Sequence, residues 1–218
     1  MADNLRVAVL ISGRGTNLQA LIDACAKNDF PAEIVRVISN NEDAFGLKIA
    51  QAAGLSTTVI NHRGFKNRTS FEETLSADLE EHGTELICLA GFMRLLTSGF
   101  VRYWHDRLIN IHPSLLPAFK GLNTHRRTIE EGVRVAGCTV HFVRADMDAG
   151  PIIAQAAVAV LPDDDESTLA SRILAQEHVI FPLALRLIAS GRIKVINEIV
   201  QIDGELTSPD PLVSPKLN

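Results

Sequence analysis

Short apolar runs alternate with amphipathic stretches along the first half of the chain. The β-branched run RVAVLIS, at residues 6–12, is closed by Gly13 and Gly15, and apolar side chains then follow at helical spacing over 17–27. The same order recurs, with strands expected at 34–39, 57–60 and 85–90 and helices at 44–53 and 70–82. Such alternation predicts a parallel sheet covered by helices on both faces.

The second half of the chain predicts a different connectivity. A strand is expected at 108–112, and two more at 137–143 and 153–161 are joined by a polar loop, which favours an antiparallel addition over a crossover. A short helix at 124–131, a long helix at 167–190 containing Pro182, and short strands at 194–197 and 199–202 complete the pattern. The expected class is α/β, a mostly parallel, Rossmann-like open sheet with an antiparallel C-terminal part.

Composition narrows the class of protein. With 218 residues, 46% hydrophobic and 22% charged, the chain suits one globular domain, here placed at 1–203, with a flexible tail at 204–218. A net charge of -5, with scattered cations, gives no general reason to bind nucleic acid or an anionic membrane. The chain also has no apolar run of about 18 residues and no secretory leader pattern. Three widely spaced cysteines indicate reduced thiols, so we expect a cytoplasmic location.

A glycine loop, SGRGTNLQAL at residues 12–21, is the first candidate site. Glycines let the backbone approach an anion, and the free amides of the following helix start can bind phosphate, with Asn17 as a candidate helix cap. Leu18 stands where a dinucleotide fingerprint has its third glycine, so a monophosphate is favoured. A plain tight turn is the competing interpretation. Farther along, Ser70 and Glu73 predict a capping box.

The strand end LINIHPSLLP, at residues 108–117, is the second candidate. Asn110 and His112 differ by two positions and so share one face of a strand. Their N–H groups suit the stabilisation of an oxyanion formed during acyl transfer, while Pro113 stiffens the exit and Leu116-Pro117 is a candidate cis bond. A strand end with a hydrogen-bonded histidine is the plainer alternative.

Two loops are less specific on their own. In HFVRADMDAGPII, at 141–153, Asp146 and Asp148 are either solvated acids or partners of His112, and sequence spacing cannot decide between these. In AGFMRLLTSGF, at 90–100, the favoured interpretation is that the apolar side chains pack in the core. The alternative is that they form the wall of a pocket for a flat aromatic ligand.

Together these segments resemble the phosphoribosylglycinamide formyltransferases. The resemblance runs through LISGRGTNLQALID, SNNEDAFGL, LAGFMRLL, INIHPSLLPAFKG, GCTVHFV, DMDAGPII and AQEH, in order and across the chain to about residue 200. It implies transfer of a formyl group from 10-formyltetrahydrofolate, a co-substrate, to the amino group of glycinamide ribonucleotide, without a metal. It also implies that Asn110, His112 and Asp148 are the catalytic trio, with Asp148 supporting a protonated His112.

The resemblance further implies two binding sites within a single formyltransferase domain at 1–203. The ribonucleotide and its phosphate would lie in the N-terminal half, on Gly15, Thr16, Asn17 and the later acid Glu177. Folate would lie toward the C-terminal half, on Arg68, Met93, Arg94, Leu95, Leu96, Asn110, Arg144, Ala145, Asp146, Met147 and Asp148. The partners are therefore small molecules, and a monomer and a homodimer both stay open. Arg14 and Asn123 depart from the family pattern, and His125 is assigned no role.

Several other classes of protein share part of this sequence pattern. Methionyl-tRNA formyltransferase would add a basic C-terminal domain and formyltetrahydrofolate hydrolase an N-terminal regulatory domain, and we expect room for neither. A non-catalytic module that binds folate or a phosphorylated metabolite would lack one of the trio, yet all three residues are present. A nicotinamide-dependent oxidoreductase needs an acid at the second strand's tip, where this chain has Ser39, Asn40 and Asn41.

Overall fold

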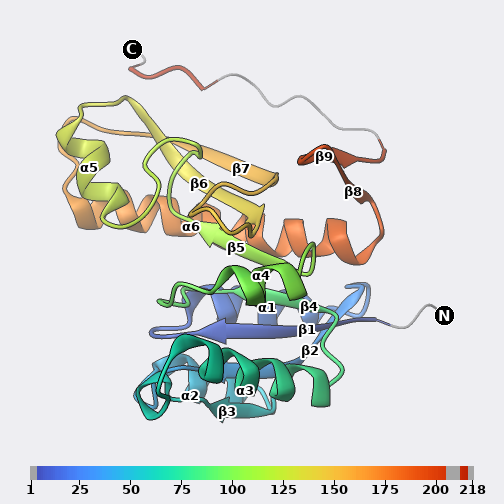
Figure 1. Cartoon of the computed structure of the whole chain (residues 1–218). Coiled ribbons are helices and arrows are strands. Elements are labelled where there is room, and N and C mark those ends of the chain that lie inside the picture. The colour runs from blue at the N-terminus through green and yellow to red at the C-terminus, as the bar shows by residue number, and fades with distance from the viewer. Residues whose placement is uncertain (1–3, 205–211, 216–218) are drawn as a thin grey trace.

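Seven strands form one sheet in the computed structural model, which describes residues 4–204 and 212–215 (Figure 1). The strand order is β3-β2-β1-β4-β5-β6-β7, and β1 to β5 are parallel while β6 and β7 are antiparallel additions. This confirms the expected fold class. The strands are β1 (Leu5–Ile11), β2 (Ala32–Ser39), β3 (Thr57–Val59), β4 (Leu86–Leu89), β5 (Leu108–His112), β6 (Val135–Phe142) and β7 (Ile152–Ala159).

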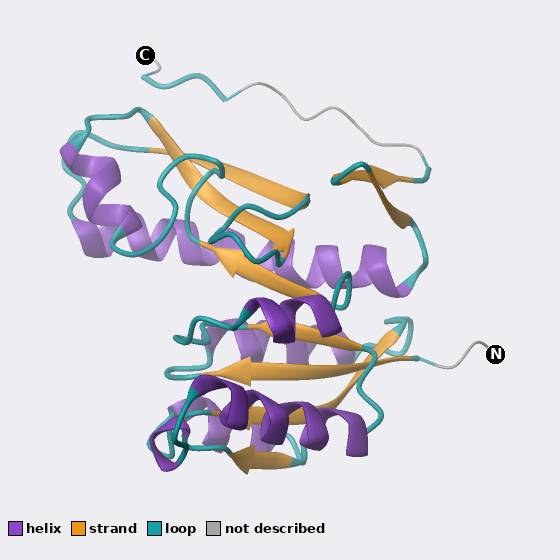
Figure 2. Ribbon diagram, in the orientation of Figure 1, coloured by secondary structure: helices purple, strands orange, loops and turns teal. Residues whose placement is uncertain are grey.

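Helices cover both faces of the sheet because the central strands are apolar on both sides. Along β1, Val7, Val9 and Ile11 join one core cluster, while Ala8 and Leu10 join the other, as the two-residue period of a strand requires. The first cluster includes helices α1 (Thr16–Cys25), α2 (Phe45–Ala52) and α6 (Glu166–Ala189); the second includes α3 (Arg68–Glu81) and α4 (Ser98–Tyr103) (Figure 2).

The C-terminal part adds two smaller features. Helix α5 (Thr124–Glu130) lies between β5 and β6, and β8 (Ile193–Ile196) and β9 (Ile199–Ile202) form a separate antiparallel hairpin. Helix α6 continues through Pro182 in one 24-residue element, although proline removes one backbone donor. Of the expected tail at 204–218, residues 205–211 and 216–218 lie outside the described residues.

Two expected helix caps are wrong. Helix α3 begins at Arg68, and the side chain of Asn67, not Ser70, is its cap, because the Ser70 amide donates to the Asn67 side chain over 2.9 Å. The N-cap of α1 is Gly15, and the Asn17 side chain is engaged elsewhere. The sequence patterns also did not indicate α4 or the 3-10 turn η1 (His62–Gly64).

Parallel strands bring the glycine loop and the loop after β4 to one edge of the sheet. The strand order reverses between β1 and β4, the position at which open α/β sheets hold their ligands beyond the carboxyl ends of the strands. One bond crosses this crevice, since the backbone amide of Met93, after β4, donates to Oγ of Ser12, after β1, over 2.7 Å. The fold therefore places the glycine loop beside the loop that carries Met93.

Candidate active site

The glycine loop is held by a close backbone contact with the start of α2. Gly15 has φ 78°, and a Cβ atom added to it would lie 2.5 Å from Cα of Gly46. The Gly46 amide also donates to the Gly13 carbonyl over 3.0 Å. Gly15 has no side chain with which to cap α1, so the amides of the first helical turn stay available to an anion. The loop is thus a candidate anion site whose backbone would have to shift to accept a side chain at Gly15.

A buried polar pair lies directly behind this loop. Nδ2 of Asn17, on α1, donates to Oε2 of Glu177, on α6, over 2.6 Å, and both side chains are buried. Burial raises the pKa of Glu177, and the hydrogen bond from Asn17 partly opposes that rise. Oδ1 of Asn17 is buried and has no hydrogen-bond partner among the described residues. The pair therefore offers acceptor oxygens beside the anion site.

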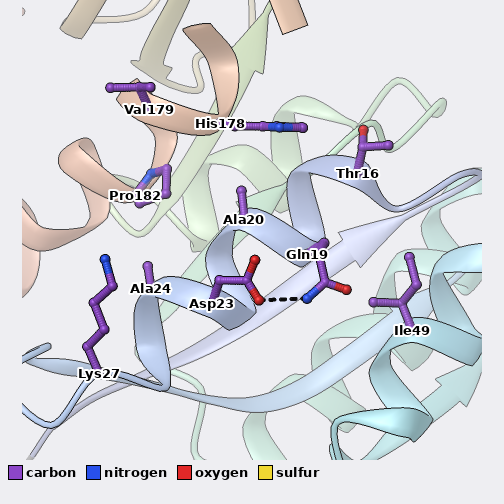
Figure 3. A pocket seen from close by; sticks show the side chains of 10 residues that line it. All are labelled: Thr16, Gln19, Ala20, Asp23, Ala24, Lys27, Ile49, His178, Val179 and Pro182. Atoms are coloured by element: carbon purple, nitrogen blue, oxygen red, sulfur yellow. Dashed lines mark hydrogen bonds between the residues drawn. The ribbon is translucent and has the colours of Figure 1, made fainter. Parts of the chain in front are cut away.

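A cavity of about 600 Å³ lies on the outer side of the same helix pair (Figure 3). Thr16 and His178, the neighbours of Asn17 and Glu177, line it together with the small side chains of Ala20 and Ala24. The residues of the catalytic trio are not among its lining residues. The cavity borders the anion site but is separate from the catalytic cluster described next.

At the end of β5, the structure brings His112 and Asp148 together. Nδ1 of His112 lies 3.5 Å from Oδ2 of Asp148, and the same oxygen accepts from the Gly121 amide over 2.8 Å. Nε2 of His112 lies 3.1 Å from the carbonyl oxygen of Phe119 and so must carry a proton. Asp148, at φ 48°, thus directs its carboxylate toward Nδ1 of His112.

His141 is a part of the cluster that the sequence pattern missed. It lies opposite Asn110 in the β5–β6 register, and its Nε2 is 3.3 Å from the Asn110 amide nitrogen. Nδ1 of His141 donates to the Phe142 carbonyl over 2.9 Å, and burial lowers the pKa of His141, which keeps the ring neutral. A neutral ring with Nδ1 protonated must accept at Nε2, so it orients the amide of Asn110.

The cluster has the chemistry of an oxyanion site. Asn110 keeps one amide N–H beyond the one that faces His141, and the His112 ring lies two residues farther along the same strand end. Both ring nitrogens of His112 already face protein oxygens. To donate a hydrogen bond to a substrate oxygen, Nε2 must therefore give up its bond to the Phe119 carbonyl.

The family model described as formyl transferase matches residues 5–185. The chain belongs to the formyl transferase family. The matched region of this formyltransferase includes all three catalytic-trio residues predicted from the sequence, as well as the glycine loop and Glu177.

Named relatives resemble this formyltransferase over most of its length. Phosphoribosylglycinamide formyltransferase of Escherichia coli is 42% identical over 205 residues, which are 94% of this chain and 97% of that protein. The structure of glycinamide ribonucleotide transformylase 1 from Symbiobacterium toebii has 47% identity and a TM-score of 0.90, over 93% and 95% of the two chains.

A longer relative matches through one part only. The trifunctional purine biosynthetic protein adenosine-3 of Bos taurus is 53% identical over 190 residues, which cover 87% of this formyltransferase and 19% of that protein. The chain therefore spans 14% to 19% of the length of the trifunctional relatives that it matches.

The residues predicted to hold folate are spread over several loops of this formyltransferase. Arg68 is the exposed first residue of α3, while Met93 and Leu95 project from the loop after β4, where Met93 is 69% and Leu95 57% exposed. Arg94 and Leu96 in that loop are half-buried. In the loop after β6, Ala145, Asp146 and Met147 are exposed, and Arg144 and Asp148 are half-buried. Met93, Leu95 and Met147 are thus accessible, whereas Leu96 packs against the second core cluster.

Within residues 4–204 and 212–215, no group of three or more His, Cys, Asp or Glu side chains is arranged to hold a metal ion. The same ranges contain no helix with both the length and the apolar character needed to cross a bilayer. Cys25, Cys88 and Cys138 are free thiols, as expected, and Leu116-Pro117 is cis.

Proposed function

We propose that this chain transfers the formyl group of 10-formyltetrahydrofolate to the amino group of glycinamide ribonucleotide, a step of purine biosynthesis. The observation that carries the proposal is the meeting of Asn110 and His112, at the end of β5, with Asp148 from a distant loop. The resemblance of the chain to phosphoribosylglycinamide formyltransferases supports the choice of substrates.

In this proposal the ribonucleotide lies on the N-terminal side of the single domain at 1–203. Its phosphate binds the first-turn amides at Gly15, Thr16 and Asn17, where the helix dipole also favours an anion. Glu177 accepts hydrogen bonds from the sugar hydroxyls or the amine, since its buried carboxylate lies beside Asn17.

The chemical step begins when the substrate amine attacks the formyl carbon. The C–N bond forms, the carbonyl oxygen becomes an oxyanion, and the free amide N–H of Asn110 and the charge of His112 stabilise it. The amine then loses a proton, the leaving nitrogen of folate gains one, and the bond between that nitrogen and the formyl carbon breaks. Asp148, whose carboxylate lies 3.5 Å from Nδ1 of His112, supports that ring and assists these proton movements through water.

Folate binds between the loop after β4 and the loop after β6. Met93, Leu95 and Met147 are exposed apolar side chains suited to cover a flat ring system. Arg68, at the exposed start of α3, supplies a cation for the acidic end of the co-substrate. The reaction as proposed uses no metal, and three free thiols support a reducing, cytoplasmic location.

A comparison of acceptors tests the proposal. Purified protein and 10-formyltetrahydrofolate are mixed with glycinamide ribonucleotide, with methionyl-tRNA, or with water alone, and formyl transfer to each acceptor is followed. We expect transfer to glycinamide ribonucleotide to dominate. A preference for tRNA or water would replace the proposed substrate with that of another enzyme of the same chemistry.

The phosphate site is tested with an acceptor that lacks the phosphate. Glycinamide riboside retains the amine and the sugar, so the chemistry is unchanged while the ligand of the helix-start amides is removed. We expect a much higher KM for the riboside than for the ribonucleotide. Equal KM values would reject the glycine loop as the phosphate site.

A further inference from the structure

The Arg144 guanidinium joins three segments that are far apart in the sequence. Its Nε donates to Oε2 of Glu198 over 2.6 Å, and its Nη2 donates to Oδ1 of Asp106 over 2.7 Å and to Oε1 of Glu198 over 3.3 Å. Its Nη1 donates to the Val143 carbonyl over 3.1 Å. We call Arg144, Asp106 and Glu198 the Arg144 clamp.

The clamp has the geometry of a specific ion pair. Glu198 receives two bonds from one guanidinium, an arrangement that only arginine provides in this planar form. The Arg144 side chain is 13% exposed, whereas its two acidic partners lie at the surface. Its stem also lies close to the far end of its own loop, since a Cβ atom added to Gly150 would lie 3.2 Å from Cγ of Arg144.

The segment held in this way is the loop that carries Asp148. Residue 144 opens the loop, and at its closing end the Phe142 amide donates to the Pro151 carbonyl over 2.9 Å. Between these ends, the Asp148 carboxylate accepts from the Gly121 amide over 2.8 Å and lies 3.5 Å from Nδ1 of His112 and 3.9 Å from Nε2 of His141. The side chains of Ala145, Asp146 and Met147 are exposed, so the clamp is the main side-chain restraint at the opening of the loop.

Glu198 belongs to the tight turn between β8 and β9. Asn197 and Glu198 both have positive φ, 50° and 59°, which fits a two-residue hairpin turn. The hairpin is a separate two-stranded sheet, and its turn projects the Glu198 carboxylate onto Arg144. The Glu198 side chain thus connects this turn to the loop that carries Asp148.

We propose that Arg144 is a positioning residue for the Asp148 loop, and that Glu198 makes the C-terminal hairpin a determinant of affinity for the formyl-folate co-substrate. The inference rests on the proposed function, because it names which substrate the loop serves. It assigns Arg144 an indirect role: its nitrogens bind protein acceptors and set the path of the backbone that meets the co-substrate.

The test compares four variants in steady-state kinetics. Arg144→Ala removes the clamp, Arg144→Lys keeps one charge without the planar fork, and Glu198→Gln leaves the arginine in place but removes the charge of its partner. Asp29→Asn is the matched control, because Asp29 also pairs with a surface arginine, Arg186, over 3.1 Å, away from this loop. Hydrogen exchange of the amides at 143–151 is measured for each variant without substrates.

The clamp predicts a split between the two substrates. Arg144→Ala should raise KM for 10-formyltetrahydrofolate about tenfold, since small displacements of a binding loop are costly, and should leave KM for glycinamide ribonucleotide unchanged. Glu198→Gln should raise the folate KM about threefold, and Arg144→Lys should recover part of the loss. Exchange at 143–151 should quicken in the alanine and glutamine variants and stay as in wild type in Asp29→Asn.

Each other outcome overturns the inference. A raised folate KM in Arg144→Ala with unchanged exchange and a normal Glu198→Gln variant would mean that Arg144 touches the co-substrate directly. Wild-type KM and wild-type exchange in both variants would mean that the clamp positions nothing. If the wild-type protein transfers no formyl group, the proposed function fails, while the exchange measurement still decides whether the clamp restrains the loop.

Discussion

The two proposed substrate regions of the molecule differ in how their residues are packed. On the ribonucleotide side, the glycine loop is fixed by a backbone contact between Gly15 and Gly46, and the polar pair Asn17 and Glu177 is 8% and 7% exposed. On the folate side, the corresponding side chains are open, and Leu95 and Met147 are 57% and 51% exposed. The residues of the first region are fixed in place in the free protein. Those of the second region form an apolar surface that is exposed in the free protein.

The difference follows from the two ligands. A phosphate is bound best by amides that are already oriented, because little entropy is then lost on binding. A flat ring system is bound by burial of apolar surface, which requires accessible side chains in the free protein. Substitutions in the first region should therefore change both folding and binding, whereas those in the second should change binding alone.

The largest expected effect is on kcat, from substitution of Asn110 or His112. Asn110→Ala and His112→Ala should each lower kcat about 10²-fold or more with little loss of fold, the size expected for removal of an oxyanion donor. Turnover and the thermal unfolding temperature are measured together. His82→Ala, at the end of α3, is the control and should keep wild-type turnover. Wild-type turnover in Asn110→Ala or His112→Ala would remove that residue from the mechanism.

The ribonucleotide region is tested at Gly15. Gly15→Ala should lower the free energy of unfolding by about 1–3 kcal/mol, because it adds strain at φ 78° and a Cβ atom 2.5 Å from Cα of Gly46. Displaced amides should also raise KM for the ribonucleotide more than about tenfold. Gly54→Ala is a matched control, since Gly54 has φ 72° and open space around an added Cβ. Equal effects of the two changes on KM would break the claim that this backbone contact shapes the site.

Glu177 offers a test that depends on pH. Burial raises the pKa of Glu177 in the folded protein. The folded protein therefore holds this proton more tightly than the unfolded chain does. As a result, the free energy of unfolding falls as pH rises from the ordinary glutamate pKa toward the raised value. Glu177→Gln should raise the unfolding temperature at neutral pH and leave it unchanged below the ordinary glutamate pKa. The same change should raise KM for the ribonucleotide about tenfold.

The exposed Glu130 provides the control for that change. Glu130→Gln should alter neither the pH dependence of stability nor the ribonucleotide KM. If Glu177→Gln is no more stable than wild type at neutral pH, the charge of Glu177 does not destabilise the free protein.

The smallest effect is expected on the folate side. Leu95→Ala should raise KM for 10-formyltetrahydrofolate about fivefold by removing apolar contact area, and should leave the unfolding temperature unchanged because Leu95 is exposed in the free protein. Leu161→Ala removes a leucine of similar exposure after β7 and should change neither quantity. A large loss of stability in Leu95→Ala would contradict the contrast between the two regions.

The sequence was sufficient for most of the fold, because strand and helix periodicity is a local property. The antiparallel addition was also predicted correctly, from the polar loop between β6 and β7. Helix α4 was missed, since its six residues include a glycine and are too few to show a helical period. The cap of α3 was misplaced because Asn67 and Ser70 are both good cap residues, and only the backbone geometry distinguishes them.

The candidate site required information that spacing does not contain. The pairing of His112 with Asp148 came from the family resemblance, and the structure places them 3.5 Å apart. His141 could have been found only from the register that sets it opposite Asn110. The Arg144 clamp depends on three turns that meet in space, one of them in the C-terminal hairpin, and no pattern in the sequence links them.

The most direct test of the account is a crystal structure of the protein with glycinamide ribonucleotide and a folate analogue that cannot transfer its formyl group. The account predicts the phosphate at the amides of Gly15 to Asn17, and the formyl oxygen within hydrogen-bond distance of Asn110 and next to His112. It also predicts the substrate amine facing the formyl carbon. A formyl oxygen directed away from both residues, or a phosphate bound outside the glycine loop, would contradict it.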